Sequence, residues 1–486
     1  MVFKNILKSL SLKSRKLESG NSKIINERSD TDWRSIYIAT FVALISSIQG
    51  FSIIPILWPY IKFINPEISE IANGAFQGAS ALGNAIASIF SGYLVNKTSN
   101  TKPALIISRI LAIFSTFIYF GIELNSNSAV YLMIAYQLFM GISFGFGNVY
   151  RTHIAMATKE SERSKGYGLS NLSYSLGTIL GPLIQLIFSL IHYPGIKLLF
   201  GMHLNLYTAS VYLALFTSII GLFALIFFFY GNLNILSKED NPQNVQEIVA
   251  VVNTCNINDS EKKEENKLEK FDIKYDKIAV CVLIYAKNVH ETIMLILFSI
   301  TMPYAMSIFE WNSQQLIFYQ SLFMAPMGIC SVIFSICYIR FKLDQKIPER
   351  IALIIAIGLF IMFFGATFPW PFISSKIPYE HEQNRTAYFL HSEASAALLN
   401  TNKSELVGCK IEYKWCETTP RINLAIFGTS IVLFLGIGIP LLSINLDILY
   451  SKVLGPIKQG VLQGIFLSSG EIINILGPII VTLVYK

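Results

Sequence analysis

The sequence predicts an all-α protein that crosses a membrane many times, and three observations lead to that fold class. Only 14% of the 486 residues are charged, whereas about 25% of the residues of a soluble domain are charged. Apolar stretches of about 20 residues, each long enough to cross a hydrocarbon core about 30 Å thick, recur along nearly the whole chain. The aromatic content of 13% also suits a bilayer, because tyrosine and tryptophan collect at its interfaces.

About eleven apolar spans can be placed along the chain. Those before a polar stretch lie at residues 36–60, 72–95, 104–122, 130–155, 167–191 and 207–230. Those after it lie at residues 278–301, 315–339, 351–370, 422–448 and 460–485. We therefore expect a polar tail at 1–35, a first bundle of six helices at 36–230 and a second bundle at 278–486. The segment between the bundles, 231–277, has the charged composition of a disordered connector.

One phrase occurs twice in the chain, late in the fifth span and late in the eleventh. Ile179-Leu180-Gly181-Pro182 recurs as Ile475-Leu476-Gly477-Pro478, and Gly168 and Gly464 match at the same offset. Proline removes a backbone donor and clashes with the preceding turn. We therefore expect the helices to break at two motifs, formed by Gly177, Gly181 and Pro182 and by Gly477 and Pro478. Internal symmetry of this kind is how many transporters are built.

The net charge of +7 comes from basic residues in short loops, so we expect no nucleic-acid partner. These residues are concentrated in loops after even-numbered spans, for example Lys97, Lys159, Arg340 and Lys452. The positive-inside rule then places the amino terminus and the connector in the cytoplasm.

The long loop 371–421 follows an odd-numbered span and is therefore expected on the opposite side of the membrane. It carries glycosylation sequons at Asn384 and Asn402. It also contains Cys409 and Cys416, which an oxidising lumen would allow to form a disulfide. Two free thiols are the alternative.

Several motifs resemble those of the major facilitator superfamily. The run from Gly177 to Pro182 is similar to its GxxxGP motif, and Gly92-Tyr-Leu-Val-Asn96-Lys97 is similar to its GxxxD(R/K) loop with Asn96 in place of the acid. This resemblance implies two six-helix bundles. The chain stops at Lys486, where the resemblance implies a twelfth helix.

A second resemblance, to a lysosomal branch of the same superfamily, depends on Leu449-Tyr-Ser-Lys-Val-Leu-Gly-Pro456 and on Gly408-Cys409 with Trp415-Cys416. It implies a location in the lysosomal membrane and transport of a small solute or anion, with chloride as the leading substrate. Asn474 stands where that branch has an arginine.

Ionisable side chains at membrane depth are costly and are candidates for function. Glu291 lies well inside the seventh span, and Lys287 lies one turn before it. We expect Glu291 to relay a proton or ion along the transport pathway. The alternative is a Lys–Glu pair that neutralises itself, with Lys287 extending toward the interface.

A second group of candidates comes from the second, fourth and eleventh spans. Glu471 lies mid-span in the eleventh, one turn before Asn474, and we expect it to be functional or to be neutralised by Arg151. Arg151 would bind an anion or brace a gate, and Asn84 would line a cavity or join two helices. Asp447, near a helix end, is expected to be solvated.

No motif for hydrolysis, nucleotide binding or metal binding occurs in the sequence, so we expect no enzyme activity, no cofactor and no metal. The expected function is alternating-access transport in a lipid bilayer by a monomer, with Glu291 or Glu471 supplying proton coupling. Two alternatives remain at this point. One is a passive anion channel lined by Arg151 and Lys287, and the other is a non-transporting scaffold or receptor.

Overall fold

The computed structural model describes most of the chain. The described residues are 31–233 and 275–485, apart from gaps at 66–67, 69, 126–127, 189, 192–193, 199–201, 312, 372–375, 380, 384–404, 410–413, 417–418 and 456. Most of the expected connector and both sequons lie outside them. Within them, 11 helices are long and apolar enough to cross a membrane.

The first bundle contains six of these spans. Its helices are α2 (Trp33–Ile64), α3 (Glu70–Thr98), α4 (Lys102–Leu124), α5 (Ala129–Gly147), α6 (Val149–Ala157), α7 (Arg163–Phe188) and α8 (Ala209–Phe227). α5 and α6 together form one span. A 3-10 turn (Glu160–Glu162) precedes α7, and the strands β1 (Ile196–Lys197) and β2 (His203–Leu204) pair antiparallel before α8.

The second bundle contributes five spans. Its helices are α10 (Lys277–Phe309), α11 (Ser313–Arg340), α12 (Leu343–Lys346), α13 (Glu349–Ala366), α15 (Leu424–Ser430), α16 (Gly436–Leu454) and α17 (Gly460–Tyr485). A π-helical turn (Ile431–Leu435) joins α15 to α16 in one span. The strands β3 (His381–Gln383) and β4 (Glu405–Val407) pair antiparallel, and a 3-10 turn (Lys414–Cys416) follows. The prediction of an all-α protein with about eleven spans is confirmed.

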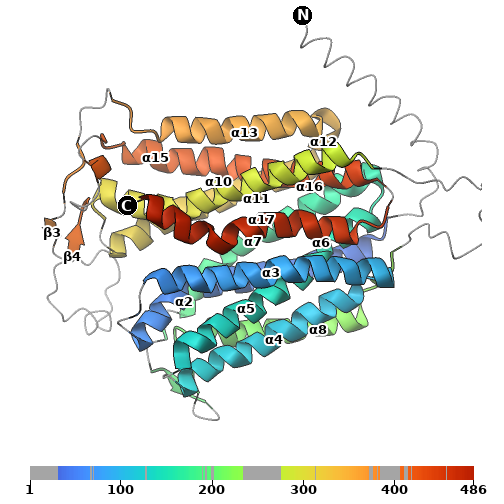
Figure 1. Cartoon of the computed structure of the whole chain (residues 1–486), viewed down its shortest axis with the longest axis horizontal. Helices are drawn as coiled ribbons and strands as arrows, with labels where there is room; N and C mark the ends of the chain where they lie inside the picture. The colour runs from blue at the N-terminus through green and yellow to red at the C-terminus, as the bar shows by residue number, and fades with distance from the viewer. Residues whose placement is uncertain are drawn as a thin grey trace, which may run out of the picture.

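The two ends of the helical array differ in composition. β3, β4 and the disulfide between Cys409 and Cys416 lie at one end, which we call the disulfide end, and α12 lies at the other (Figure 1). The loops near α12 carry many basic residues, among them Lys97, Lys159 and Lys342, so we call this the basic end.

The expected helix breaks at the two Gly-Pro motifs are wrong. α7 continues through Pro182, and α17 continues through Pro478. The first of these segments packs closely on α2: a Cβ on Gly181 would lie only 2.8 Å from the carbonyl carbon of Phe51. A proline is tolerated in a membrane helix where neighbouring helices support the backbone in this way.

Buried apolar side chains join the two bundles at the basic end. One cluster combines Ile36, Ile154 and Tyr167 of the first bundle with Tyr338 and Ile444 of the second. At the disulfide end, the described clusters stay within their own bundles. The bundles are therefore packed together most firmly at the basic end.

Candidate functional site

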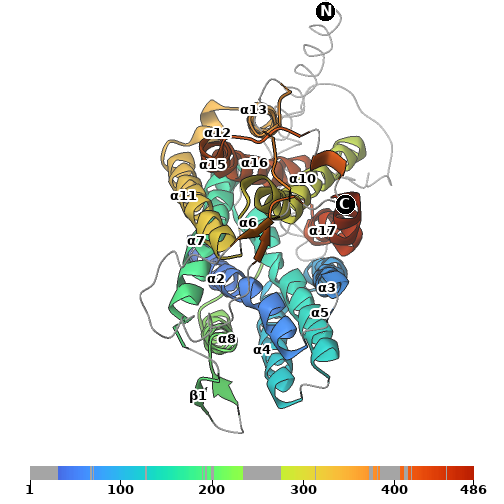
Figure 2. The ribbon, with the colours of Figure 1, turned by 90° about the vertical axis from the view of Figure 1, so that its left-hand side faces the viewer.

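Two pairs of helices form the seams between the bundles. α3 lies beside α17 on one side of the molecule, and α7 lies beside α11 on the other (Figure 2). Along the first seam the two backbones come unusually close. A Cβ on Gly464 of α17 would clash with the carbonyl oxygen of Ser88 in α3, and Gly92 meets Gly460 in the same way. Small residues allow such an approach in membrane helices.

Glu471 lies in this first seam and is bound by amides. The Asn84 side chain of α3 donates a hydrogen bond of 2.8 Å to Glu471 Oε1, and Asn474 Nδ2 lies 3.4 Å from Oε2. Asn84 Oδ1 in turn accepts hydrogen bonds from Ser88 and from Asn148, each 3.1 Å long. Within the described part of the chain, Glu471 has no cation as an ion-pair partner. The carboxylate therefore joins α17 to α3 without being neutralised, and Asn84 extends the network to Asn148 in the fourth span.

Glu291 differs from Glu471 because it has a cation. Lys287 Nζ lies 2.6 Å from Glu291 Oε1, and the two side chains are only 11% and 20% exposed. His290 Nδ1 lies 3.3 Å from the same oxygen. A Cβ on Gly470 of α17 would lie 3.4 Å from Glu291 Cδ. The Lys287–Glu291 pair of α10 therefore packs against Gly470 of α17, which is the residue directly before Glu471.

Arg151 does not neutralise Glu471. Its Nη1 lies 2.7 Å from Oδ2 of Asp447, which is 12% exposed, so the expectation that Asp447 is solvated is wrong. Asp447 lies on α16 and Arg151 on α6, so this pair joins the bundles near the basic end. Its side chains pack beside the apolar cluster that closes this end, and Arg151 also stacks on Tyr150.

The second seam is neutral. Ser175 and Ser331 share a hydrogen bond of 2.7 Å, and Asn171 donates one of 3.0 Å to Ser335. Ser175 of α7 occupies the place in the first Gly-Pro copy that Glu471 occupies in the second. The sequence prediction did not assign a contact to Ser175, Ser331 or Asn148. An amide directly after the glycines of the fourth span was the available signal for Asn148.

At the disulfide end, an acidic side chain ties the loop to α10. Glu310 Oε1 lies 2.9 Å from Arg421 Nη1, and its Oε2 lies 3.4 Å from His381 Nε2. The disulfide between Cys409 and Cys416 closes the adjacent turn, and Cys409 is fully buried. No group of three or more potential metal ligands occurs among the described residues.

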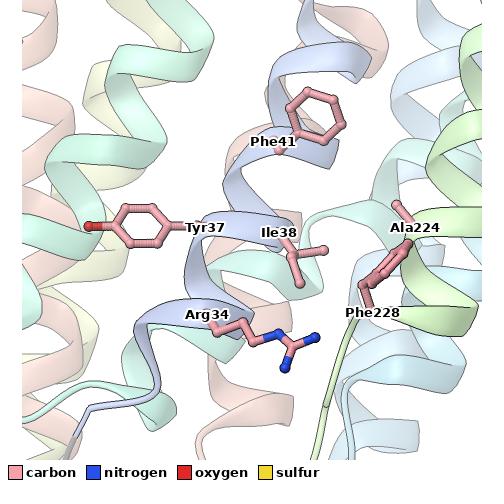
Figure 3. A pocket seen from close by; sticks show the side chains of 6 residues that line it. All are labelled: Arg34, Tyr37, Ile38, Phe41, Ala224 and Phe228. Atoms are coloured by element: carbon pink, nitrogen blue, oxygen red, sulfur yellow. The ribbon is translucent and has the colours of Figure 1, made fainter.

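A groove of about 620 Å³ lies on the outside of the first bundle, and the side chains of these polar contacts do not line it. Its walls come from α2 and α8 (Figure 3). The lining residues are Arg34, Tyr37, Ile38, Phe41, Ala224 and Phe228.

Comparison with known proteins decides the family. Residues 39–380 match the family model of the Major Facilitator Superfamily. The chain belongs to this superfamily. It is a multi-pass membrane protein of a transporter family, and its described spans lack one helix of the two six-helix bundles that the resemblance implied.

Particular relatives agree with this assignment. The chain is 28% identical to the Major facilitator superfamily domain-containing protein 8 of Xenopus laevis, over 93% of this chain and 86% of that protein. The crystal structure of the human organic anion transporter MFSD10 superposes with a TM-score of 0.56 at 15% identity and covers 92% of each chain. A variant of the E. coli fucose:proton symporter FucP gives 0.54 at 14% identity, over 92% of this chain and 90% of that one.

Proposed function

We propose that this protein is a secondary transporter that moves a small solute or anion by alternating access and couples that movement to protons at Glu471. The observation that carries the proposal is the hydrogen bond from Asn84 to Glu471, which joins the two bundles through a carboxylate without a cation partner among the described residues. A charged carboxylate in such a site is expensive, so binding a proton there is chemically favoured over leaving it ionised.

The protonation state of Glu471 bears directly on the contact between the bundles. As a carboxylate it accepts hydrogen bonds only, and Asn84 and Asn474 both present amide donors to it. A proton on either oxygen removes one acceptor position and adds a donor. The seam between α3 and α17 then changes strength with protonation, as proton-coupled rocking of the bundles requires.

Glu291 is a weaker candidate for the coupling group. Its ion pair with Lys287 stabilises the charged form, so a proton has to compete with a cation 2.6 Å away. In this proposal Glu291 and Lys287 form a neutral ion pair beside Glu471 and do not themselves exchange the coupled proton. The described pairs also weigh against a channel lined by free cations, because Arg151 and Lys287 are each neutralised by a carboxylate.

The direction of access follows from charge. The positive-inside rule assigns the basic end to the cytosol, where the apolar cluster and the Arg151–Asp447 pair hold the bundles together. A solute would then enter from the disulfide end, which we assign to the lumen together with Asn384 and Asn402. We propose the lysosomal membrane as its location on the resemblance of residues 449–456.

Proteoliposomes containing pyranine test the coupling. A panel of sugars, amino acids, carboxylates and chloride is added outside at two internal pH values, and proton movement is followed with each solute. We expect at least one solute to drive proton flux through the native protein. Glu471→Gln keeps the size of the glutamate side chain but cannot bind or release a proton. It is expected to abolish that proton flux, while solute exchange continues in the absence of a proton gradient.

The matched control is Glu291→Gln in the neighbouring helix, which is expected to slow exchange but retain coupling. Full coupling in Glu471→Gln would contradict the proposal. A chloride current without any proton movement, measured by patch clamp on the native protein, would instead identify a passive anion channel.

A further inference from the structure

The groove between α2 and α8 combines an apolar wall with a cation at its mouth. Arg34 and Ile38 extend from α2 toward Phe228 at the end of α8, and Phe41 lies farther along the same wall (Figure 3). Phe41 and Phe228 are each 48% exposed although both are large and apolar. Because these helices span a membrane, this face of the bundle meets lipid rather than water.

The level of the groove in the bilayer follows from its neighbours. Lys165 Nζ lies 3.9 Å over the ring of Trp33, and Arg34 Cζ lies 5.7 Å from the ring centre of Tyr230. Aromatic and basic side chains of this kind collect at the membrane–water interface. Phe41 lies about 10 Å deeper than Arg34 at 1.5 Å per residue, which is the depth of the acyl chains.

The charge at the mouth is available to a ligand. Arg34 is exposed and forms no ion pair with a carboxylate of the described residues; its guanidinium lies over the ring of Tyr230. Lys102, on α4, brings a second cation to the same end of α8, because its Nζ donates a hydrogen bond of 2.7 Å to the carbonyl oxygen of Ile226. A guanidinium binds phosphate oxygens in pairs and is the preferred protein group for them.

We infer that this groove binds one anionic phospholipid of the leaflet at the basic end, with its phosphate at Arg34 and an acyl chain along Ile38, Phe41 and Ala224. Charge complementarity selects this occupant: the leaflet on the cytosolic side is rich in anionic lipids, which attract basic side chains at its surface. The inference uses the orientation proposed above but does not depend on proton coupling, so either can fail alone.

The volume fits such an occupant. About 620 Å³ lies within the 300–1,000 Å³ range of clefts that hold small ligands. The groove is open rather than enclosed, which lets a lipid enter sideways while the rest of its chains remain in the membrane. The site shares no residue with the polar contacts of Glu471, which lie in the seam between α3 and α17.

Native mass spectrometry of the purified full-length protein tests the inference. The protein is titrated with phosphatidylserine or with phosphatidylcholine of identical acyl chains, and the retained lipid is counted. We expect the native protein to retain phosphatidylserine several-fold better. Arg34→Gln should lower phosphatidylserine retention by about fivefold, the effect of one basic residue near an anionic surface, and should leave phosphatidylcholine unchanged.

Two pairs of variants separate headgroup from chain. Arg340→Gln removes an exposed arginine at the same end of the other bundle and should change nothing. Ala224→Trp fills the groove and should lower retention of both lipids. Its control, Ile226→Trp, places the same bulk on the same helix at a lipid-exposed position outside the groove, and should retain both.

Four outcomes overturn the inference. Equal retention of the two lipids by the native protein would mean that the groove holds neutral lipid. Identical selectivity in the Arg34→Gln and Arg340→Gln variants would remove the assigned headgroup contact. Retention of neither lipid would indicate another occupant, such as the segment 1–30 of the chain. Competition by soluble glycerophosphoserine at equal concentration would identify a site for a free phosphate ester rather than a lipid.

Discussion

Helices α7 and α17 contain the two copies of the Gly-Pro phrase, and each reaches across to the opposite bundle with a side chain at the same place in the copy. In α7 that side chain is Ser175, which meets Ser331 of α11. In α17 it is Glu471, which meets Asn84 of α3. The two seams share a plan and differ in chemistry: one is held by hydroxyl groups and the other by a carboxylate.

This difference indicates how a duplicated scaffold can respond to protons on one side only. A hydroxyl pair has the same donors and acceptors at every physiological pH, so the seam between α7 and α11 acts as a constant contact. A carboxylate changes its hydrogen-bonding capacity when it is protonated, so the seam between α3 and α17 is the one that pH can loosen or tighten. Within the second bundle, the Lys287–Glu291 pair of α10 packs on Gly470, the residue directly before Glu471 in α17.

The largest effect on stability is expected from Lys287→Met. This change leaves the mostly buried Glu291 carboxylate without its cation, a loss typically of about 3–5 kcal/mol for a buried pair. The thermal unfolding midpoint of the purified protein should fall sharply. The double variant Lys287→Met with Glu291→Gln should recover most of the loss because the unpaired charge is gone. A single variant as stable as the native protein would show that Glu291 is neutral or solvated at this place.

A smaller effect separates the two seams at matched glycines. At Gly464 an added Cβ clashes with the backbone oxygen of Ser88, whereas at Gly168 it meets side-chain atoms alone, with Ile339 Cγ1 at 2.7 Å and Tyr338 Cδ1 at 3.8 Å. Gly464→Ala should therefore destabilise the protein by about 1–3 kcal/mol, as overpacking commonly does. Gly168→Ala should cost less, because a side chain can rotate and a backbone cannot. Unfolding midpoints of the two variants give the comparison, and equal losses would mean that the seams are packed alike.

Much of this fold is predictable because the bilayer imposes it. Each span has to be apolar over its whole length, so hydropathy alone locates eleven spans. The basic residues in the loops between them predict which side of the membrane each loop faces. The pairing of Lys287 with Glu291 is also local, since side chains four residues apart meet on a helix. Asn84, Glu471 and Asn474 could be named from the sequence because polar groups are rare at that depth.

The errors concern contacts between distant segments. Asp447 reads as solvated because it lies near a helix end, and its partner Arg151 belongs to the other bundle. That contact depends on the rotation of two helices about their axes, which hydropathy does not determine. The expected breaks at Pro182 and Pro478 fail for a related reason: local propensity predicts them, but packing by neighbouring helices holds the backbone helical.

The smallest effect is expected at the neutral seam, and it isolates what the carboxylate adds. Ser175→Ala removes a hydroxyl pair, and interhelical hydrogen bonds in membranes contribute about 0.6 kcal/mol on average. The unfolding midpoint should shift by little, and by the same amount at pH 5 and pH 7.5, because nothing titrates at this contact. Glu471→Ser, measured alongside it, makes the first seam, between α3 and α17, resemble the second, between α7 and α11. If the comparison is correct, the difference in stability between this variant and the native protein varies with pH, while the difference for Ser175→Ala does not. A pH-independent difference for both would show that Glu471 keeps one protonation state throughout, and the seams would then differ only in strength.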